Sequence, residues 1–377
     1  MTEKIFVTLT IISSILANNP TNAQSLDIKT TKKLDNYFQK HIETESNQPV
    51  ANILVEILDG KNEKKYQKAF GYKTTNGKIR ATKDLTFKIA SITKMFTATI
   101  ILQLMEEGKL SLDDELAKFL PENDFVKLDS LHLHDLKSSG RHITVAQLLG
   151  HRSGLADIFI DTEDKFRDYV LSDKNRVWKP KDLFEFYYRF GLNHMAHFPP
   201  GEGFYYSDTN YFLLGLLIEK ITDSTLAEQF RSRVFAPAKM NQTYFEYYED
   251  PMVKHNMAHA YLGDIDITTE INTSYDWAGG GIVSTTNDLT LFLHHLFQNR
   301  FFKDKETLGL MIPKDDYGFG MHKFVIKKRT FYGHLGYWGS GVFYDIERQK
   351  SIAISVNQVH TTFDKGKFIQ KVASLLE

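Results

Sequence analysis

The sequence predicts an α+β fold in which segments from both termini build one antiparallel sheet of five or more strands, flanked by helices. Strand-like patterns lie near both ends of the chain, whereas the middle, to about residue 300, consists mostly of helical patterns joined by Gly, Pro and Asn loops. The length of 377 residues and the hydrophobic content of 42% suit one large domain or two lobes that share a cleft. We therefore expect a mainly helical lobe inserted into the sheet.

The N-terminal half of the sheet is expected to follow a helix. Apolar residues at helical spacing predict an amphipathic helix over 27–43. Two strands are predicted over 50–58 and 66–72, and the turn residues between them are typical of a β-hairpin. A long apolar helix is expected over about 93–107, where Gly108 provides a suitable C-terminal cap.

The C-terminal part returns to short apolar runs, which predict three strands and a last helix over 324–326, 341–344, 351–356 and about 364–376. Together, these elements predict a single domain over 24–377. Its sheet lobe and helical lobe are expected to cover about 27–88 with 320–377, and about 89–319, respectively.

The first 23 residues resemble an export signal. Lys4 precedes a short apolar run over 5–17, polar residues follow, and Ala23 offers a small residue for cleavage. The run is too short to span a bilayer, which needs roughly 20 apolar residues. We expect residues 1–23 to be a signal peptide and the mature protein to be periplasmic or secreted, without a stable membrane span.

Composition excludes several classes of function. The net charge is −1 and no Lys/Arg run stands out, so nucleic-acid binding is not expected. The chain has no cysteine, which rules out a thiol nucleophile, a disulfide framework and a cysteine zinc site. The pairs His132/His134 and His194/His197 lack a nearby carboxylate in a known zinc spacing, so we expect no metal.

Ser91 and Lys94 form the first motif with chemical content. Residues three apart on a helix share a face, so the hydroxyl and the amine can touch. A serine needs an adjacent base to become a good nucleophile, and a partly desolvated lysine can lose its charge and take that role. The alternative is that Ser91 only caps the following helix while Lys94 is exposed.

Two further motifs lie downstream. Tyr206 and Asp208 are placed on a loop at the start of an apolar helix, where Asp208 could also be a simple cap. The third is the glycine-rich segment 333–341, which contains His334 and leads into a predicted strand. So many glycines at the entry of a strand indicate close backbone approach by a ligand.

Taken together, the three motifs resemble the penicillin-recognising serine hydrolases. The similarity is to the branch with class C β-lactamases, D-Ala-D-Ala carboxypeptidases, D-aminopeptidases and related esterases, which carries Ser-x-x-Lys, Tyr-x-Asn, and Lys-Thr-Gly or His-x-Gly in this order. Other landmarks agree with it, namely Phe87–Ser91, Glu107–Asp114, Phe119–Pro121, Thr144–Leu155 and Ala278–Thr286. The resemblance spans roughly residues 50–360 and implies a β-lactamase/transpeptidase-like fold.

The resemblance also implies roles for the motif residues. Ser91 would attack a carbonyl carbon and become acylated, with Lys94 and Tyr206 sharing the general-base duty. The oxyanion would lie between the backbone N–H groups of Ser91 and Tyr337, the latter presented by Gly336. His334 would replace the family lysine, steer the polarity of the substrate and support the Tyr206 hydroxyl.

Two positions depart from the family pattern. Asp208 stands where the family has asparagine, and an ionised carboxylate accepts hydrogen bonds but does not donate them. Leu335 stands where threonine would bind the carboxylate of a penicillin or of a terminal D-alanine. Both changes disfavour substrates that carry a carboxylate.

The sequence thus predicts an exported serine hydrolase that forms an acyl-enzyme on a peptide amide, containing a D-amino acid, or on an ester. The alternatives are a β-lactamase or D-Ala-D-Ala carboxypeptidase, and a non-catalytic binding protein. The expected partner is a small-molecule or peptide substrate, such as a cell-wall fragment, and no cofactor is expected.

Overall fold

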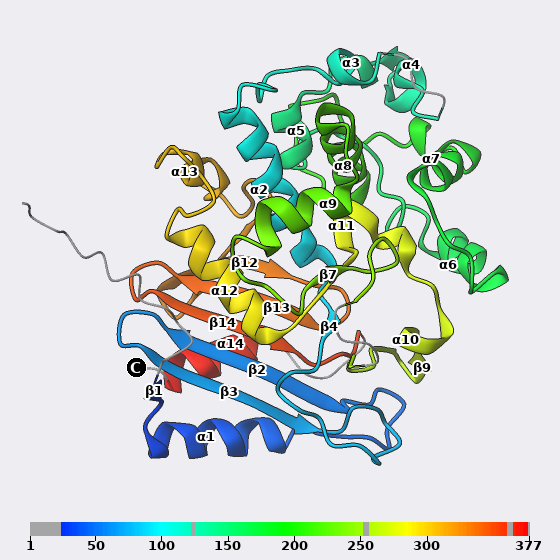
Figure 1. Cartoon of the computed structure of the whole chain (residues 1–377). Coiled ribbons are helices and arrows are strands. Elements are labelled where there is room, and N and C mark those ends of the chain that lie inside the picture. Colours follow the sequence, from blue (N-terminus) through cyan, green and yellow to red (C-terminus); the bar gives the residue numbers. More distant parts are fainter. Residues whose placement is uncertain (1–23, 122–124, 252–255, 360–364, 376–377) are drawn as a thin grey trace, which may run out of the picture.

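Segments from the two ends of the chain lie side by side in the central sheet (Figure 1). The computed structural model describes residues 24–121, 125–251, 256–359 and 365–375, and the predicted signal segment 1–23 lies outside them. Within these ranges a seven-stranded sheet has the order β1-β3-β2-β14-β13-β12-β11. Its strands are β1 (Gln24–Ser25), β2 (Asn52–Asp59), β3 (Lys64–Gly71), β11 (His322–Ile326), β12 (Arg329–Leu335), β13 (Ser340–Asp345) and β14 (Lys350–Ser355).

The two halves of the sheet join at the antiparallel pair β2–β14, in which Leu54 lies opposite Ser355. The other neighbours are antiparallel too, except that β1 runs parallel to β3. The predicted sheet built from both termini is confirmed, and one short parallel strand makes it mixed.

Strand β12 differs from the prediction, which placed the segment 333–341 before a strand. Residues 333–335 instead end a strand and pair with β13. A side-chain carbon built on Gly333 would lie 1.9 Å from the carbonyl oxygen of Val342, so only glycine fits there. Gly333 weakens the strand pattern in the sequence, whereas in the folded protein the contacts with the neighbouring strands hold this segment as a strand.

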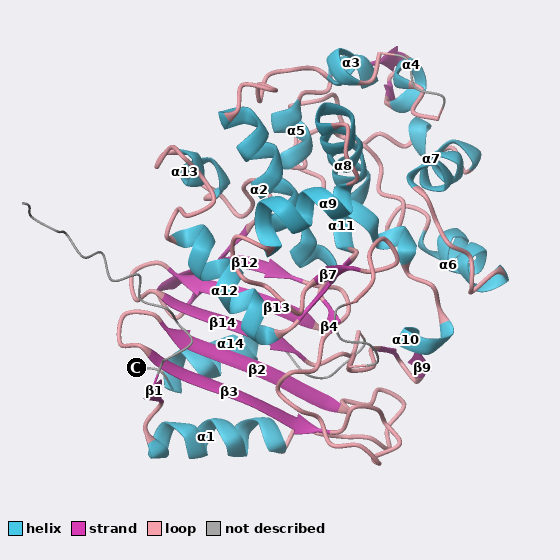
Figure 2. Ribbon diagram, viewed as in Figure 1, coloured by secondary structure: helices cyan, strands magenta, loops and turns pink. Residues whose placement is uncertain are grey.

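Helices cover both faces of the sheet (Figure 2). α1 (Ile28–Gln39) and α14 (Lys365–Leu375) share one hydrophobic cluster with one face, through buried residues such as Phe38 and Phe368. α12 (Thr286–Phe297) packs on the other face, against β2 and β14. Although α12 falls in the range predicted for the helical lobe, it belongs to the covering of the sheet.

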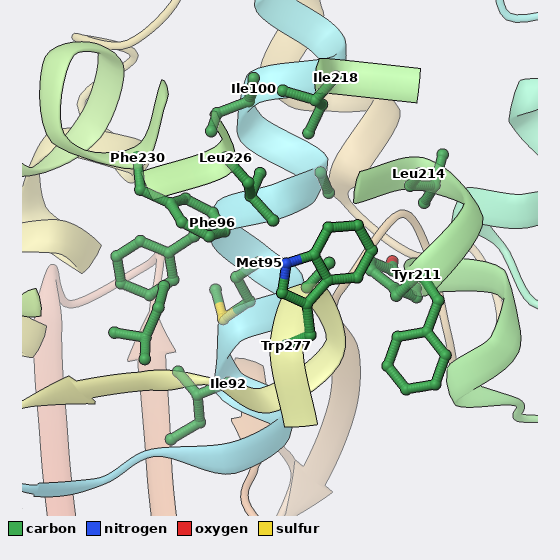
Figure 3. Packing of buried hydrophobic residues seen from close by; sticks show 14 of the residues in the cluster. Ile92, Met95, Phe96, Ile100, Tyr211, Leu214, Ile218, Leu226, Phe230 and Trp277 are labelled. Carbon is green, nitrogen blue, oxygen red and sulfur yellow. The ribbon is translucent and has the colours of Figure 1, made fainter. Parts of the chain in front are cut away.

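The predicted long helix is α2 (Thr93–Glu106), which is buried on nearly every side. Figure 3 shows Met95 and Phe96 of α2 among side chains of its neighbouring helices, such as Trp277. These neighbours are α8 (Asp208–Thr222), α9 (Leu226–Phe230) and α11 (Trp277–Gly280). Such enclosure holds α2 rigidly, together with the side chains at its N-terminal end.

A small antiparallel sheet leads the chain into α2. Its strands are β4 (Phe87–Lys88), β10 (Ile282–Ser284) and β7 (Tyr244–Phe245), with β10 in the middle. The remaining elements are α3 (Leu116–Phe119), α4 (Leu128–Leu131), β5 (Leu133–His134), β6 (Lys137–Ser138), α5 (Val145–Leu149), α6 (Glu163–Ser172), α7 (Pro180–Arg189), β8 (Tyr261–Leu262), β9 (Ile265–Asp266), α10 (Ile267–Glu270) and α13 (Thr307–Met311). Among the described residues, no helix is long and apolar enough to cross a membrane.

Candidate active site

Ser91 lies in a single 3₁₀ turn, Ala90–Ile92, directly before α2. The strand pairing of β4 with β10 brings the chain to this point, and the N–H of Ile89 donates to the carbonyl of Ile282 at 3.0 Å. Ala90 has φ of +47°, a left-handed conformation that costs free energy for a residue with a side chain. Strain of this kind often accumulates next to reactive groups, because the surrounding fold imposes it.

Lys94 is fully buried beside Ser91. Its Nζ donates to Asp208 Oδ1 at 2.5 Å, to the carbonyl oxygen of Gly279 at 3.0 Å and to Ser91 Oγ at 3.1 Å. An ammonium group has three donors, and these three acceptors match them. The predicted contact between the serine and the lysine is therefore present, and α8 and α11 complete its surroundings.

The charge state of Lys94 differs from the expectation of a neutral base. Burial alone lowers the pKa of Lys94, but the negative charge of Asp208 and the contact with Tyr206 outweigh it, so the pKa lies above its ordinary value. The ion pair with Asp208 thus keeps Lys94 as an ammonium at neutral pH. In this form it stabilises negative charge on Ser91 or Tyr206 and accepts no proton.

Tyr206 precedes α8 and places its hydroxyl at the same point. The hydroxyl lies within hydrogen-bonding reach of both Lys94 and Ser91. Burial raises the pKa of Tyr206 to about 12, although the charge of Lys94 acts in the opposite direction. The ring stacks on His151, with ring centroids 4.3 Å apart, which fixes its orientation. Ser91, Lys94, Tyr206 and Asp208 therefore form one cluster.

His334 lies near this cluster but contacts a different tyrosine from the one expected. Its Nε2 is 3.3 Å from the hydroxyl of Tyr317, and its Nδ1 donates to the carbonyl of Leu335 at 2.7 Å. Within the described residues it makes no hydrogen bond with Tyr206, whose ring centroid is 6.1 Å away. Burial lowers the pKa of His334 well below its usual range, aided by His322 and Lys94, which favours the neutral imidazole.

Leu335 also differs from the expectation, which placed it among the substrate-binding residues. Successive residues of a strand face opposite sides of the sheet, and His334 takes the side of Ser91. Leu335 packs instead with the cluster under α1 and α14 that includes Phe343. Its side chain is therefore turned away from the nucleophile.

The turn between β12 and β13 packs directly on the chain that leads to Ser91. The hydroxyl of Ser340 donates to the carbonyl of Ile89 at 2.9 Å, and a side-chain carbon on Gly336 would lie 2.3 Å from the same oxygen. Tyr337 is 53% exposed, and no group among the described residues accepts a hydrogen bond from its backbone N–H. The absence of a side chain at Gly336 thus lets the turn that carries Tyr337 lie close to Ile89 and Ser91, as an oxyanion site at Tyr337 requires.

Three further polar residues support the cluster and were not singled out from the sequence. The buried Asp157 accepts hydrogen bonds from backbone N–H groups of Asp208, at 2.5 Å, and of Ile160, at 2.7 Å, and so anchors the start of α8. Burial raises the pKa of Asp157 to about 7, and the charge of Asp208 adds to the effect. His151 and Tyr317 complete the hydrogen-bonded chain that reaches His334.

His151 is the only one of these three within a sequence landmark, Thr144–Leu155. Its Nδ1 accepts from the backbone N–H of Ser207 at 3.1 Å, which leaves Nε2 to donate to the Tyr317 hydroxyl at 3.2 Å. Tyr317 comes from a loop without a recognisable motif. Only the folded structure brings it against His334, so no signal in the sequence could have found it.

The glycine run 279–281 has a packing role here. A side-chain carbon on Gly279 would lie 2.5 Å from Asp208 Oδ1, and one on Gly281 would lie 2.8 Å from the ring of Phe245. Glycine lets α11 approach the Lys94–Asp208 pair closely enough to present the Gly279 carbonyl.

In the described part of the chain, no group of three or more His, Cys, Asp or Glu residues is arranged to hold a metal ion.

Comparison with known families agrees with this geometry. The profile of the Beta-lactamase family matches residues 54–375, which is most of the chain. The chain therefore belongs to the Beta-lactamase family. This membership and the structural neighbours below identify it as a serine hydrolase with the β-lactamase fold, as the sequence predicted.

Two curated relatives are similar over part of their length. Penicillin-binding protein 4* of Bacillus subtilis (strain 168) is 27% identical over 297 residues, which cover 72% of this chain and 60% of that protein. Protein flp of Staphylococcus aureus (strain MRSA252) is 28% identical over 237 residues, or 62% of this chain and 43% of that protein. The chain thus spans less than two thirds of the length of these relatives.

Solved structures match over nearly the whole chain. A D-stereospecific amidohydrolase from Streptomyces sp. has a TM-score of 0.71 and 27% identity, covering 89% of this chain and 95% of that one. The D-amino acid amidase of Ochrobactrum anthropi SV3 has a TM-score of 0.75 and 24% identity, with coverage of 92% and 98%. The second match shows the shared fold.

Proposed function

We propose that this serine hydrolase forms an acyl-enzyme on Ser91 and acts on small amides or esters of amino acids or peptides, including those of D-amino acids. The observation that carries the mechanism is the contact of Lys94 Nζ with both Ser91 Oγ and Asp208 Oδ1, at 3.1 and 2.5 Å. The similarity to the D-stereospecific amidohydrolase supports the substrate class. Export by residues 1–23 stays a prediction.

In the proposed first step, Ser91 Oγ attacks the carbonyl carbon while its proton passes to the phenolate oxygen of Tyr206. The reaction requires the phenolate form of Tyr206, whose negative charge the adjacent Lys94 ammonium stabilises. The backbone N–H groups of Ser91 and Tyr337 would hold the oxyanion. Tyr206 then gives the proton to the leaving amine or alcohol, and the same groups activate the water that releases the acyl product.

The test is a substrate panel combined with covalent labelling. We expect intact-mass analysis to find one fluorophosphonate adduct on Ser91, and we expect D-amino-acid amides and short p-nitrophenyl esters to be hydrolysed faster than D-Ala-D-Ala peptides or nitrocefin. Absence of an adduct and of turnover would favour a non-catalytic protein. Rapid turnover of nitrocefin or of D-Ala-D-Ala peptides would contradict the proposed substrate class.

Replacing Asp208 with asparagine, Asp208→Asn, should move the pH profile of hydrolysis toward acid. The negative charge of Asp208 raises the pKa values of both Lys94 and Tyr206, so its removal lowers both. The basic form of either group then becomes available at lower pH, and the acidic limb of kcat/KM should shift down by about one pH unit or more.

The measurement is kcat/KM on one ester across the pH range. Asp223→Asn is a matched control, since Asp223 follows the far end of the same helix in a left-handed conformation that asparagine also adopts. A profile that stays in place, or moves toward alkaline pH, would show that Asp208 does not set the charge state of the base.

A further inference from the structure

Asp276 places a second carboxyl group within about 7 Å of Ala90, the residue before the nucleophile, at a position that the mechanism does not use. It ends the 3₁₀ turn Ser274–Asp276 just before α11. A side-chain carbon built on Gly280 would lie 3.3 Å from Asp276 Cγ and 3.6 Å from the carbonyl carbon of Ala90. Asp276 Cγ and the carbonyl carbon of Ala90, the residue that precedes Ser91, are therefore no more than about 7 Å apart.

Among the described residues, only one of the two oxygens of this carboxyl group has a hydrogen-bond partner. Oδ2 accepts a hydrogen bond from Nε1 of the buried Trp338 at 3.0 Å. The side chain does not cap α11, and Oδ1 has no hydrogen-bond partner among the described residues. The residue as a whole is half-buried, and the hydrogen bond to Trp338 restrains the carboxyl group, which leaves Oδ1 to accept a hydrogen bond from a ligand.

The nearby cations are engaged elsewhere. Lys88 pairs with Glu246 and donates to Thr273 Oγ1 at 2.8 Å, and Lys94 pairs with Asp208. Within the described chain, no Lys, Arg or His lies within ion-pair distance of Asp276. Burial raises the pKa of Asp276 to about 7, against the opposing effects of the Trp338 hydrogen bond and the charge of Lys88. Its carboxylate thus lacks the cation that would normally accompany such burial.

Anchoring of Trp338 alone does not explain an aspartate here. The indole N–H needs one acceptor, which an asparagine oxygen would supply without the cost of burying a charge. An unpaired carboxylate this close to the chain that carries the nucleophile is instead suited to bind a positive group of a substrate whose carbonyl lies at Ser91. The α-ammonium group of an amino acid is attached one carbon away from that carbonyl.

We propose that Asp276 binds the protonated α-amine of the acyl half of the substrate and so selects amino-acid and peptide derivatives with a free N-terminus. This inference rests on the proposed function. The free amine then belongs to the amino acid of the substrate whose carbonyl Ser91 attacks. N-acylated peptides would therefore not be preferred substrates. This recognition also differs from that of enzymes that bind a terminal carboxylate.

The test compares two substrates that differ only in the amine, D-phenylalanine p-nitroanilide and 3-phenylpropionic acid p-nitroanilide. We expect the wild-type enzyme to prefer the first, and we expect Asp276→Asn to lower the ratio of their kcat/KM values about 10- to 100-fold, as for the loss of a charge-assisted hydrogen bond. Asp276→Glu, which keeps the charge, should retain more of the preference than Asp276→Asn. Asp168→Asn, an exposed position on α6, serves as the matched control.

Labelling by a fluorophosphonate, which carries no amine, tests the nucleophile Ser91 separately from the role of Asp276. If the Asp276→Asn protein still labels at Ser91 and keeps the wild-type ratio of the two kcat/KM values, the role of Asp276 is overturned. It is also overturned if Asp276→Glu and Asp276→Asn lose the preference for the amine-bearing substrate equally. Failure of the wild-type protein to label at all would refute the proposed function and this inference with it.

Discussion

Replacement of Ser91 with alanine should lower kcat/KM by about 10⁴-fold or more on any amide or ester that the enzyme hydrolyses. The variant removes the atom that would form the acyl-enzyme, while the groups around the oxyanion stay in place. The residual rate should reflect only water attack in a site that still binds the substrate. The measurement is kcat/KM together with the intact mass after fluorophosphonate treatment, which should show no adduct.

The same variant should fold normally, so the loss can be assigned to chemistry. Ser91 is only partly buried, and Lys94 keeps Asp208 and the Gly279 carbonyl as acceptors. Ser232→Ala is a suitable control, because the Ser232 hydroxyl donates to the carbonyl of Glu228, one turn earlier in the same helical stretch. If Ser91→Ala retained more than about a hundredth of the activity and still gave an adduct, another residue would have to be the nucleophile.

Removal of one oxygen from Tyr206, in Tyr206→Phe, should lower kcat by about 10²- to 10⁴-fold, the range of general acid–base catalysis. The phenylalanine ring can keep its stacking on His151, so the variant deletes the proton acceptor and little else. The rate of fluorophosphonate labelling should fall as well, because that reaction also needs the serine proton to be removed. Thermal unfolding should stay close to that of the wild type.

The neighbouring Tyr205 provides a matched control for this variant. Its hydroxyl donates to Asp161 at 2.7 Å and its ring stacks on His197, away from Ser91. Tyr205→Phe should therefore leave kcat within a few-fold of the wild type. Equal losses in the two variants would indicate a general packing defect and would argue against Tyr206 as the base.

The sequence predicted the fold where local patterns and packing agree. The helix over 93–107 and the hairpin before it are apolar, well bounded and match α2, β2 and β3 closely. β12 was missed because Gly333 interrupts its pattern, and its place is fixed by contacts with β13 that lie outside any local window. Parallel pairing of β1 could not be foreseen either, since only two residues take part.

Within the site, contacts between residues close together in the chain could be predicted from the sequence more readily than contacts between distant residues. Ser91 and Lys94 are three residues apart, so helix geometry alone predicted their contact. Tyr206 and Asp208 were found only through the resemblance to a family. The surroundings of His334 depend on Tyr317, which arrives from a loop with no pattern of its own. Leu335 was misplaced because a motif gives the order of residues but not the face of the sheet on which each one lies.

The pairing of β2 with β14 sets an order of events during synthesis. Leu54 and Ser355 are neighbours in the sheet although about 300 residues separate them, so the sheet cannot close until the last strands have left the ribosome. α2 can form much earlier and bring Ser91 to Lys94. The turn that carries Tyr337 is made well over 200 residues after Ser91 and docks beside it as the sheet closes. A nascent chain would therefore carry its nucleophile well before it has a completed oxyanion site, and hydrolysis would begin only when the sheet has closed.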